Sequence, residues 1–200
     1  MNTAEIFNSI YAEGKWQEDG GPKSGPGSTV ANSRPVLEML EREKPTSIAD
    51  IGCGDLVFMR DFLTWHAGEF SYTGIDVSTE ALKLARTPKI PGTVFLLADV
   101  TQPGFECHAD VIVIKDILMH LWDLQLIRAL EALSRCTYNL LITNTDTGAS
   151  DERDLGGSAH WAMADLEGPL FGPHLAKLGT IVAREPRPAH GSYIAIRPHG

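Results

Sequence analysis

Short runs of apolar residues, separated by polar and glycine-rich segments, recur along most of the chain and predict a largely parallel β-sheet. Five runs rich in branched residues predict strands at Ser47–Ile51, Tyr72–Asp76, Thr93–Leu97, Asp110–Ile114 and Tyr138–Thr143. Two more, Thr180–Arg184 and Ser192–Arg197, are joined by a turn with Pro and Gly and no helical pattern. They predict a hairpin whose last strand runs antiparallel to the parallel set.

Helical patterns lie between several of these strands. Before the first strand, Pro35 is expected in the first turn of a helix whose inner face carries Val36, Leu37 and Leu40. The clearest helix has Asp123 as its expected N-cap, followed by apolar residues on one face. Alternation of strand and helix predicts an α/β, Rossmann-like, doubly wound sheet with right-handed crossovers.

The first 33 residues differ in composition from the rest, being rich in Gly, Pro, Ser and charge. Such a segment cannot form one continuous helix or strand. Its aromatic residues Phe7, Tyr11 and Trp16 indicate an arm that packs on the domain. We therefore expect residues 1–33 to be an arm or lid and residues 34–200 to be the main domain.

Composition narrows the class of protein. The 200 residues, 43% hydrophobic and 22% charged, suit one globular domain with a substantial core. No apolar run is long enough to cross a bilayer and none resembles a secretory signal, so we expect a cytoplasmic protein that does not bind membranes. The formal net charge is −9 and no Lys/Arg cluster is present, which argues against a nucleic-acid partner. Three scattered cysteines predict neither a disulfide nor a metal site, and the oligomeric state is left open.

Candidate ligand chemistry begins where the first strand ends. Gly52 and Gly54 follow it, and a turn without side chains lets a ligand approach the backbone closely. Asp76 ends the next strand, where a carboxylate can accept hydrogen bonds from ribose hydroxyls. The alternatives are a tight turn without a ligand and a carboxylate beside a helix cap.

These two features suit either NAD or S-adenosylmethionine. A dinucleotide site needs a third glycine, so that a pyrophosphate can meet the helix N-terminus. The chain instead has Asp55 at the expected helix start, and this carboxylate would repel a pyrophosphate. S-adenosylmethionine carries no phosphate, so it is the favoured cofactor.

Four segments resemble the successive motifs of class I S-adenosylmethionine-dependent methyltransferases, in the order and at the spacing of that family. They are Asp50-Ile-Gly52-Cys-Gly54, Gly74-Ile-Asp76, Leu97-Ala98-Asp99-Val100 and the run from Asp110 to Leu121. The leader Ser24-Gly25-Pro26-Gly27-Ser28 is similar to one in a set of short bacterial methyltransferase-domain proteins. That set also has an Asn-x-Asp, Gly, Trp-Arg, Pro-Phe run, matched here by Asn144-Thr-Asp146, Gly157, Trp161 and Pro169-Leu170-Phe171, with Ala162 in place of the usual Arg.

The resemblance implies a role for each matching residue. Asp50, Gly52 and Gly54 would line the methionine and ribose part of the cofactor, and Asp76 with Val77 would bind the ribose. Asp99 and Val100 would meet the adenine, while Lys115 and Asp116 would border the methyl-transfer position. The leader residues Ser24, Gly25, Gly27 and Ser28 would close over the methionine end.

Acceptor chemistry is less strongly indicated. For a hydroxyl acceptor a base must take the proton, and the candidate catalytic residues are His120 and Asp116. In the family that His often only packs near the cofactor. His160 and Trp161 are candidate acceptor-binding residues. The expected function is methylation of a small molecule; the alternatives are a cofactor-binding regulatory or scaffold protein without turnover, and an NAD-dependent oxidoreductase.

Overall fold

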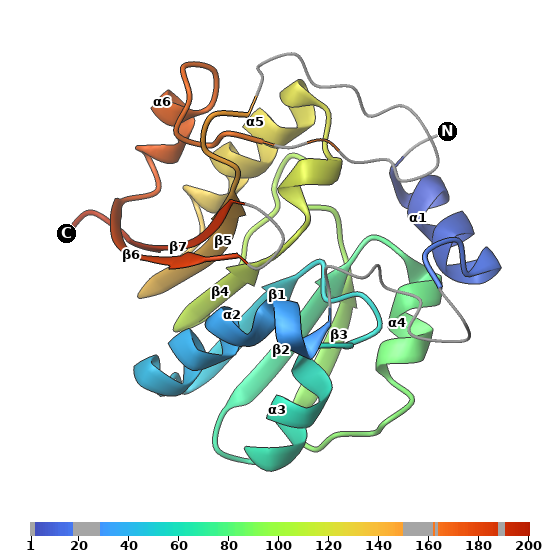
Figure 1. The fold of residues 1–200 in the computed structure, drawn as a ribbon. Helices are drawn as coiled ribbons and strands as arrows, with labels where there is room; N and C mark the ends of the chain where they lie inside the picture. Colours follow the sequence, from blue (N-terminus) through green and yellow to red (C-terminus); the bar gives the residue numbers. More distant parts are fainter. Residues whose placement is uncertain (1–2, 18–28, 150–161, 163, 188–190) are drawn as a thin grey trace.

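A single sheet organises the chain, and its strand order explains where ligands can bind. The structure is a computed structural model that describes residues 3–17, 29–149, 162, 164–187 and 191–200 (Figure 1). The described residues form a seven-stranded sheet in the order β3-β2-β1-β4-β5-β7-β6. The strands are β1 (Ser47–Ile51), β2 (Ser71–Asp76), β3 (Thr93–Leu97), β4 (Val111–Ile114), β5 (Leu140–Thr145), β6 (Thr180–Pro186) and β7 (Ser192–Arg197).

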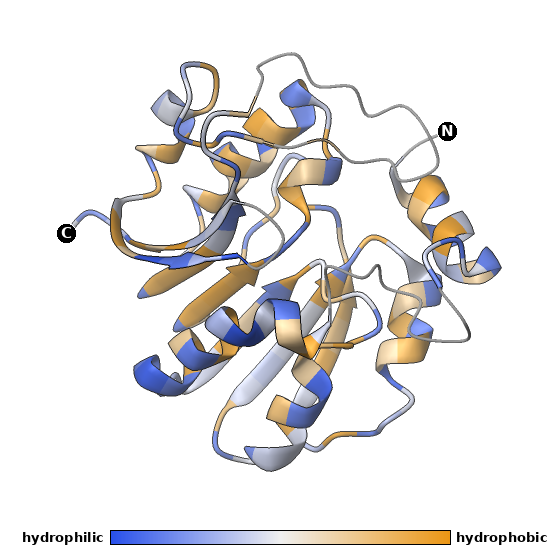
Figure 2. Cartoon of the chain, viewed as in Figure 1, coloured by the Kyte–Doolittle hydropathy of each residue, from blue (hydrophilic) through white to orange (hydrophobic). Residues whose placement is uncertain are grey.

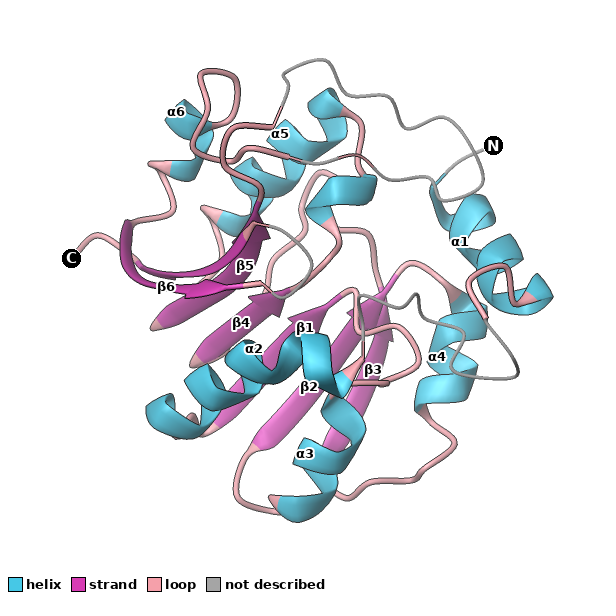
Figure 3. Ribbon diagram, in the orientation of Figure 1, coloured by secondary structure: helices cyan, strands magenta, loops and turns pink. Residues whose placement is uncertain are grey.

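The pairing confirms the predicted doubly wound topology. Strands β1 to β5 pair with one another in parallel, whereas β7 pairs antiparallel with both β5 and β6. The strand order turns back between β1 and β4, and the carboxyl ends of these two neighbours face the same edge of the sheet. Figure 3 shows the arrowheads of the parallel strands pointing toward the edge where α1 lies.

Helices cover both faces of the sheet because alternate strand residues point to opposite sides. The helices are α1 (Thr3–Glu13), α2 (Val30–Glu43), α3 (Met59–Trp65), α4 (Thr79–Ala85), the 3₁₀ helix η2 (Leu118–His120), α5 (Asp123–Leu133) and α6 (Gly172–Leu175). Buried residues of α2, α3 and α4 pack with Val111 and Val113 of β4, while those of α5 and α6 pack with Ile112 and Ile114. Both faces of β4 are therefore buried, and Figure 2 shows β4 and β5 in the most hydrophobic colours.

Two helix starts differ from the sequence-based expectation. Helix α2 begins at Val30, because the Thr29 hydroxyl accepts a hydrogen bond from the Asn32 N–H and caps it. Pro35 therefore lies inside the helix, and the expected boundary at 33/34 falls within it. In α5, Asp123 is the first helical residue rather than the cap; Gln125 Oε1 accepts from the preceding Trp122 N–H.

The N-terminal helix α1 is attached to the start of α4. Asn8 Oδ1 accepts hydrogen bonds from Ser78 Oγ, Thr79 Oγ1 and the Glu80 N–H, at 2.9, 3.2 and 3.3 Å. Phe7 and Tyr11 on the same helix are buried. Because Ser78 follows β2 by two residues, α1 is joined to the ligand-facing edge of the sheet.

Strand β3 forms one edge of the sheet and is the most exposed strand. Val94, Leu96 and Leu97 are all about half exposed, at 55, 48 and 58%. The Phe95 carbonyl points away from β2, and Arg86 of the α4 end donates to it at 2.9 Å. One outward backbone group of this edge is therefore already paired. Within the described residues, no helix is long and apolar enough to span a membrane.

Candidate functional site

The glycine turn after β1 has the shape that the sequence predicted. Gly52 and Gly54 have φ values of +79° and +56°, a region that favours glycine. The N–H groups of Gly52 and Cys53 both donate to the Ile75 carbonyl of β2, which holds the turn against that strand. A Cβ at Gly52 would collide with the Ile117 side chain after β4. This glycine is therefore favoured both by its backbone angle and by its close approach to Ile117.

The expected helix does not start straight after Gly54. Helix α3 begins at Met59, because Leu56 has φ +64° and interrupts any earlier helix. Asp55 consequently lies in the turn and not at the helix start, where it was expected to repel a pyrophosphate. Its side chain is buried, and its backbone carbonyl accepts from Arg60.

Asp76 connects β2 to the glycine turn. Its Oδ2 accepts from the Gly54 N–H at 2.9 Å and its Oδ1 from the Ser78 N–H at 2.8 Å. Burial raises the pKa of Asp76 to about 6, although these backbone hydrogen bonds lower it. Each carboxylate oxygen thus accepts one backbone hydrogen bond and has a second lone pair.

Asp50 lies deeper, beneath the same turn. It is 1% exposed, and Tyr72 Oη on β2 donates to its Oδ2 at 2.7 Å. Burial raises the pKa of Asp50 to about 7, while the Tyr72 hydrogen bond and the charge of Lys115 lower it. The carboxyl group of Asp50 therefore changes its charge close to neutral pH.

Asp99 organises the turn after β3. Its Oδ1 accepts from the Thr101 N–H and Oγ1, at 2.8 and 2.7 Å, and its Oδ2 accepts from Gln102 Nε2 at 3.0 Å. Val100 next to it is buried. This turn and the Asp76 region belong to the neighbouring strands β3 and β2, so Asp99 lies on the same edge of the sheet as Asp76.

A second group of charged residues lies at the carboxyl ends of β4 and β5. Lys115 is 4% exposed; its Nζ forms an ion pair with Asp116 Oδ2 and lies 5.1 Å from the Phe58 ring centroid. Burial lowers the pKa of Lys115. Asp116 has φ +57°, an unfavourable angle for this residue type, and its N–H donates to Asn144 Oδ1 at 2.8 Å.

Arg187, which the sequence patterns did not indicate, completes this group. It follows β6 directly, and its Nη2 lies 2.7 Å from Asp116 Oδ1. Its Nη1 lies 3.8 Å from Asp146 Oδ1, which follows β5. Gly191 has φ +71°, and a Cβ there would collide with Asp146, so a glycine is needed for the β6–β7 turn to approach it. We call Lys115, Asp116, Asn144, Asp146 and Arg187 the charged cluster.

His120 belongs to an aromatic group with the N-terminal segment. Its ring stacks on Trp16, with centroids 5.3 Å apart and planes at 26°, and meets the Phe7 ring edge-on at 5.5 Å. Trp16 also contacts Phe7 and Tyr11. The N-terminal segment thus packs against His120, in the segment after β4. Some expected residues lie outside the described residues, namely Ser24, Gly25, Gly27, Ser28, His160 and Trp161.

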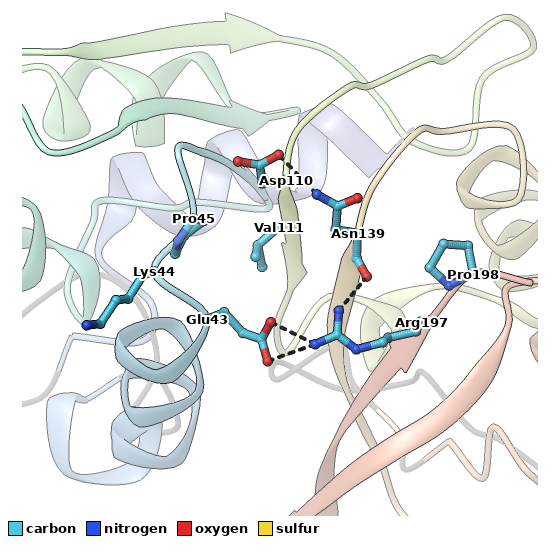
Figure 4. Close-up of a pocket in the computed structure, with 8 residues that line it drawn as sticks. All are labelled: Glu43, Lys44, Pro45, Asp110, Val111, Asn139, Arg197 and Pro198. Carbon is cyan, nitrogen blue, oxygen red and sulfur yellow. Dashed lines mark hydrogen bonds and ion pairs between the residues drawn. The ribbon is translucent and has the colours of Figure 1, made fainter. Parts of the chain in front are cut away.

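One measurable pocket lies away from these residues. It has a volume of about 430 Å³ and is lined by Glu43, Lys44, Pro45, Asp110, Val111, Asn139, Arg197 and Pro198 (Figure 4). Asp110 and Asn139 precede β4 and β5, so the pocket is at the opposite edge from the glycine turn. Two of its lining residues, Arg197 and Glu43, form an ion pair at 2.9 Å. Ligands of parallel sheets bind at the carboxyl ends of strands, and this pocket is therefore not the expected cofactor site.

The described residues contain no group of three or more His, Cys, Asp or Glu side chains placed to hold a metal ion. In the same part of the chain, the cysteines Cys53, Cys107 and Cys136 are free.

We compared the sequence and the structure with known proteins. Residues 48–139 match a family described as a methyltransferase domain. A comparison with curated proteins finds none that matches this sequence.

Many solved structures share the fold. Magnesium protoporphyrin IX methyltransferase (ChlM) from Synechocystis PCC 6803, with bound S-adenosylhomocysteine, is 13% identical, with a TM-score of 0.71 and 98% of each chain covered. The N-methyltransferase NodS from Bradyrhizobium japonicum WM9, in complex with S-adenosylhomocysteine, is 17% identical, with a TM-score of 0.66 and 96% of this chain and 100% of that chain covered. The mitomycin 7-O-methyltransferase MmcR is 19% identical, with a TM-score of 0.62 and 85% of this chain and 54% of that chain covered.

Proposed function

We propose that this chain is a class I S-adenosylmethionine-dependent methyltransferase that transfers the methyl group to a small molecule bound at the charged cluster. The observation that carries the proposal is the burial of this cluster beside the carboxyl end of β4. Lys115, Asn144 and Arg187 are between 3 and 8% exposed. Burial of the polar groups supports a small acceptor over a polymer.

Charge and similarity support the same substrate class. The net charge of −9 disfavours a nucleic-acid acceptor. NodS, ChlM and MmcR are an N-methyltransferase, a magnesium protoporphyrin IX methyltransferase and a mitomycin 7-O-methyltransferase. Two of these names specify a small-molecule acceptor.

The cofactor half of the site is proposed to act through fixed hydrogen-bonding groups. The glycine turn would admit the cofactor to the backbone, Asp76 would accept from the ribose hydroxyls, and Asp99 would meet the adenine edge. Asp50, under the turn, would compensate the positive charge of an amino group nearby. S-adenosylmethionine supplies a methyl group activated by a positively charged sulfur.

At the other half, the chain has to align the acceptor and exclude water, because the reaction is an in-line displacement. Asp116 is held by Lys115 on one oxygen and by Arg187 on the other. Because each of its oxygens already faces a cation, we assign Asp116 an orienting role. His120, packed under Trp16 and Phe7, is the other catalytic candidate.

Two measurements test the proposal. Calorimetry with S-adenosylhomocysteine should show one site per chain with micromolar affinity, about −8 kcal/mol. Methyl-labelled S-adenosylmethionine is then incubated with separate extracts of small molecules, protein and RNA. Label should appear in the small-molecule fraction only. Label in protein or RNA alone would contradict the substrate class, and binding without any transfer would favour a regulatory or scaffold protein.

A further inference from the structure

Arg187 has a buried donor that has no hydrogen-bond acceptor within the described part of the chain. The residue is 8% exposed, and its Nη2 pairs with Asp116 at 2.7 Å. Its Nη1 is fully buried and makes no hydrogen bond with any residue that the structure describes. The Asp146 oxygen at 3.8 Å is close enough for an ion pair but too far for a hydrogen bond. A buried N–H without an acceptor costs free energy, so an oxygen atom from a ligand is favoured there.

The surrounding charges limit what that ligand can be. Two cations, Lys115 and Arg187, already face two carboxylates, those of Asp116 and Asp146. An added carboxylate would be repelled by both aspartates, and an added ammonium group would be repelled by both cations. A neutral hydroxyl avoids both costs, because it accepts from an N–H and donates to a carboxylate at the same time.

We propose that Arg187 and Asp146 bind the methyl acceptor through a hydroxyl group, whose oxygen accepts from Nη1 and whose proton is donated to Asp146. This inference rests on the proposed function and specifies its substrate class as hydroxyl-bearing small molecules. Arg187 is then a specificity-determining residue, supplied by the β6–β7 turn to a site otherwise formed by β4 and β5.

The same arrangement accounts for the proton of the reaction. The hydroxyl oxygen forms a bond to the methyl carbon, and the carbon–sulfur bond breaks with its electron pair staying on sulfur. The hydroxyl proton passes to the Asp146 carboxylate and then to solvent. Asp146 takes this role because its Oδ1 lies beside the Arg187 Nη1 that would hold the hydroxyl, whereas Asp116 is paired with Lys115 and with Arg187 Nη2.

The test uses the full chain saturated with S-adenosylhomocysteine and four small probes of similar shape. Phenol carries a hydroxyl, anisole is its methylated counterpart, benzoate is an anion and benzylamine is a cation. Binding of each is measured by ligand-observed NMR titration. We expect phenol to bind about tenfold more tightly than the other three, because only phenol both donates and accepts.

Variants then assign this preference to the two residues. Arg187→Gln and Asp146→Asn should each weaken phenol binding by about tenfold, and Asp146→Asn should leave anisole unchanged, because an ether has no proton to donate. Arg187→Lys keeps the charge beside Asp116 but loses the forked donor, so it should lose the preference while remaining folded. Arg184→Gln on β6 is the matched control, since that side chain is 39% exposed and pairs with Glu167. S-adenosylhomocysteine affinity reports that each variant is intact.

Several results would overturn the inference. Tighter binding of benzoate or benzylamine that depends on Arg187 or Asp146 would make the site one for an ion and leave the small-molecule proposal standing. A preference for phenol that is lost in His120→Ala, and kept in Arg187→Lys, would transfer the role to His120. If the loaded protein binds none of the four probes, the hydroxyl site fails; if label also reaches only protein or RNA, the proposed function fails separately.

Discussion

The two halves of the site hold their carboxylates in opposite ways. At β1 and β2, Asp50 and Asp76 are stabilised by a hydroxyl and by backbone N–H groups, and burial raises the pKa of each. At β4 and β5, Asp116 is stabilised by two cations. The first half is therefore short of positive charge, whereas the second is balanced internally.

This difference indicates which ligand groups would stabilise each half. Two buried carboxylates with raised pKa values become more stable when a ligand supplies donors or positive charge. A balanced ion cluster gains little from another charge and instead selects the ligand by hydrogen bonding. The comparison predicts that neutralising an aspartate has opposite effects on the stability of the two halves.

The largest effect is expected from Asp116→Asn. The change leaves Lys115 and Arg187 buried with one less anion, and breaking a buried ion pair costs about 3–5 kcal/mol. Chemical denaturation of the apo protein should show this loss against Asp61→Asn, which neutralises an exposed carboxylate on α3. A loss equal to that of the control would mean that the cluster contributes nothing to folding.

Asp50→Asn should instead raise the stability of the apo protein. Because the folded pKa is about 7 against 3.8 in the unfolded chain, ionised Asp50 destabilises the fold by up to about 4 kcal/mol at pH 8. This cost is nearly absent at pH 4, grows as pH rises from 4 to 7, and levels off above pH 7. The variant keeps an acceptor for Tyr72, so its apo stability should exceed the wild type at pH 8 and match it at pH 4. Denaturation at both pH values checks this, and a variant less stable at pH 8 would contradict it.

Asp76→Ala should weaken cofactor binding more than folding. It removes a charge-assisted acceptor, worth about 1.5–3 kcal/mol of affinity. Calorimetry with S-adenosylhomocysteine should show the loss while the apo melting temperature changes little. Retained affinity with a collapsed melting temperature would make Asp76 purely structural.

Cofactor affinity should also depend on pH, through the two carboxylates of this half. Asp50 and Asp76 have pKa values of about 7 and about 6, and a ligand that favours their ionised forms must displace protons. S-adenosylhomocysteine should therefore bind more weakly as pH falls from 8 to 6, by up to about tenfold per unit. Calorimetry in buffers of different ionisation enthalpy measures the released protons. Release that persists unchanged in Asp50→Asn would exclude Asp50 as the source.

The smallest effect concerns the attachment of α1. Asn8→Ala removes an acceptor shared by three donors at the start of α4, at a cost of about 1 kcal/mol. Hydrogen exchange across Thr3–Glu13 should become faster, and bound S-adenosylhomocysteine should slow exchange there in the wild type if the segment acts as a lid. Ser9→Ala on the outer side of the same helix is the control.

The two halves also differed in how far the sequence predicted them. The proposed cofactor half includes Gly52, Gly54 and Asp76, which lie at or just after the ends of β1 and β2. Both strands have clear apolar patterns, so local reasoning predicted the turn and the carboxylate at this edge. The charged cluster depends on Arg187, which lies in a Pro-Arg-Pro turn without any periodic signal. Arg187 follows β6, and it reaches Asp116 because β6 pairs with β7 and β7 pairs antiparallel with β5. The start of α3 was missed for a different reason: the left-handed angle of Leu56 has no signature in residue type.

The pairing of Arg86 with the outward carbonyl of Phe95 bears on how the protein behaves at high concentration. An edge strand with exposed Val94 and Leu96 is a template on which another chain could extend the sheet. The guanidinium occupies one rung of that template and adds a charge beside it. Arg86 thus disfavours edge-to-edge association of two molecules, which is an effect on solubility and not on methyl transfer.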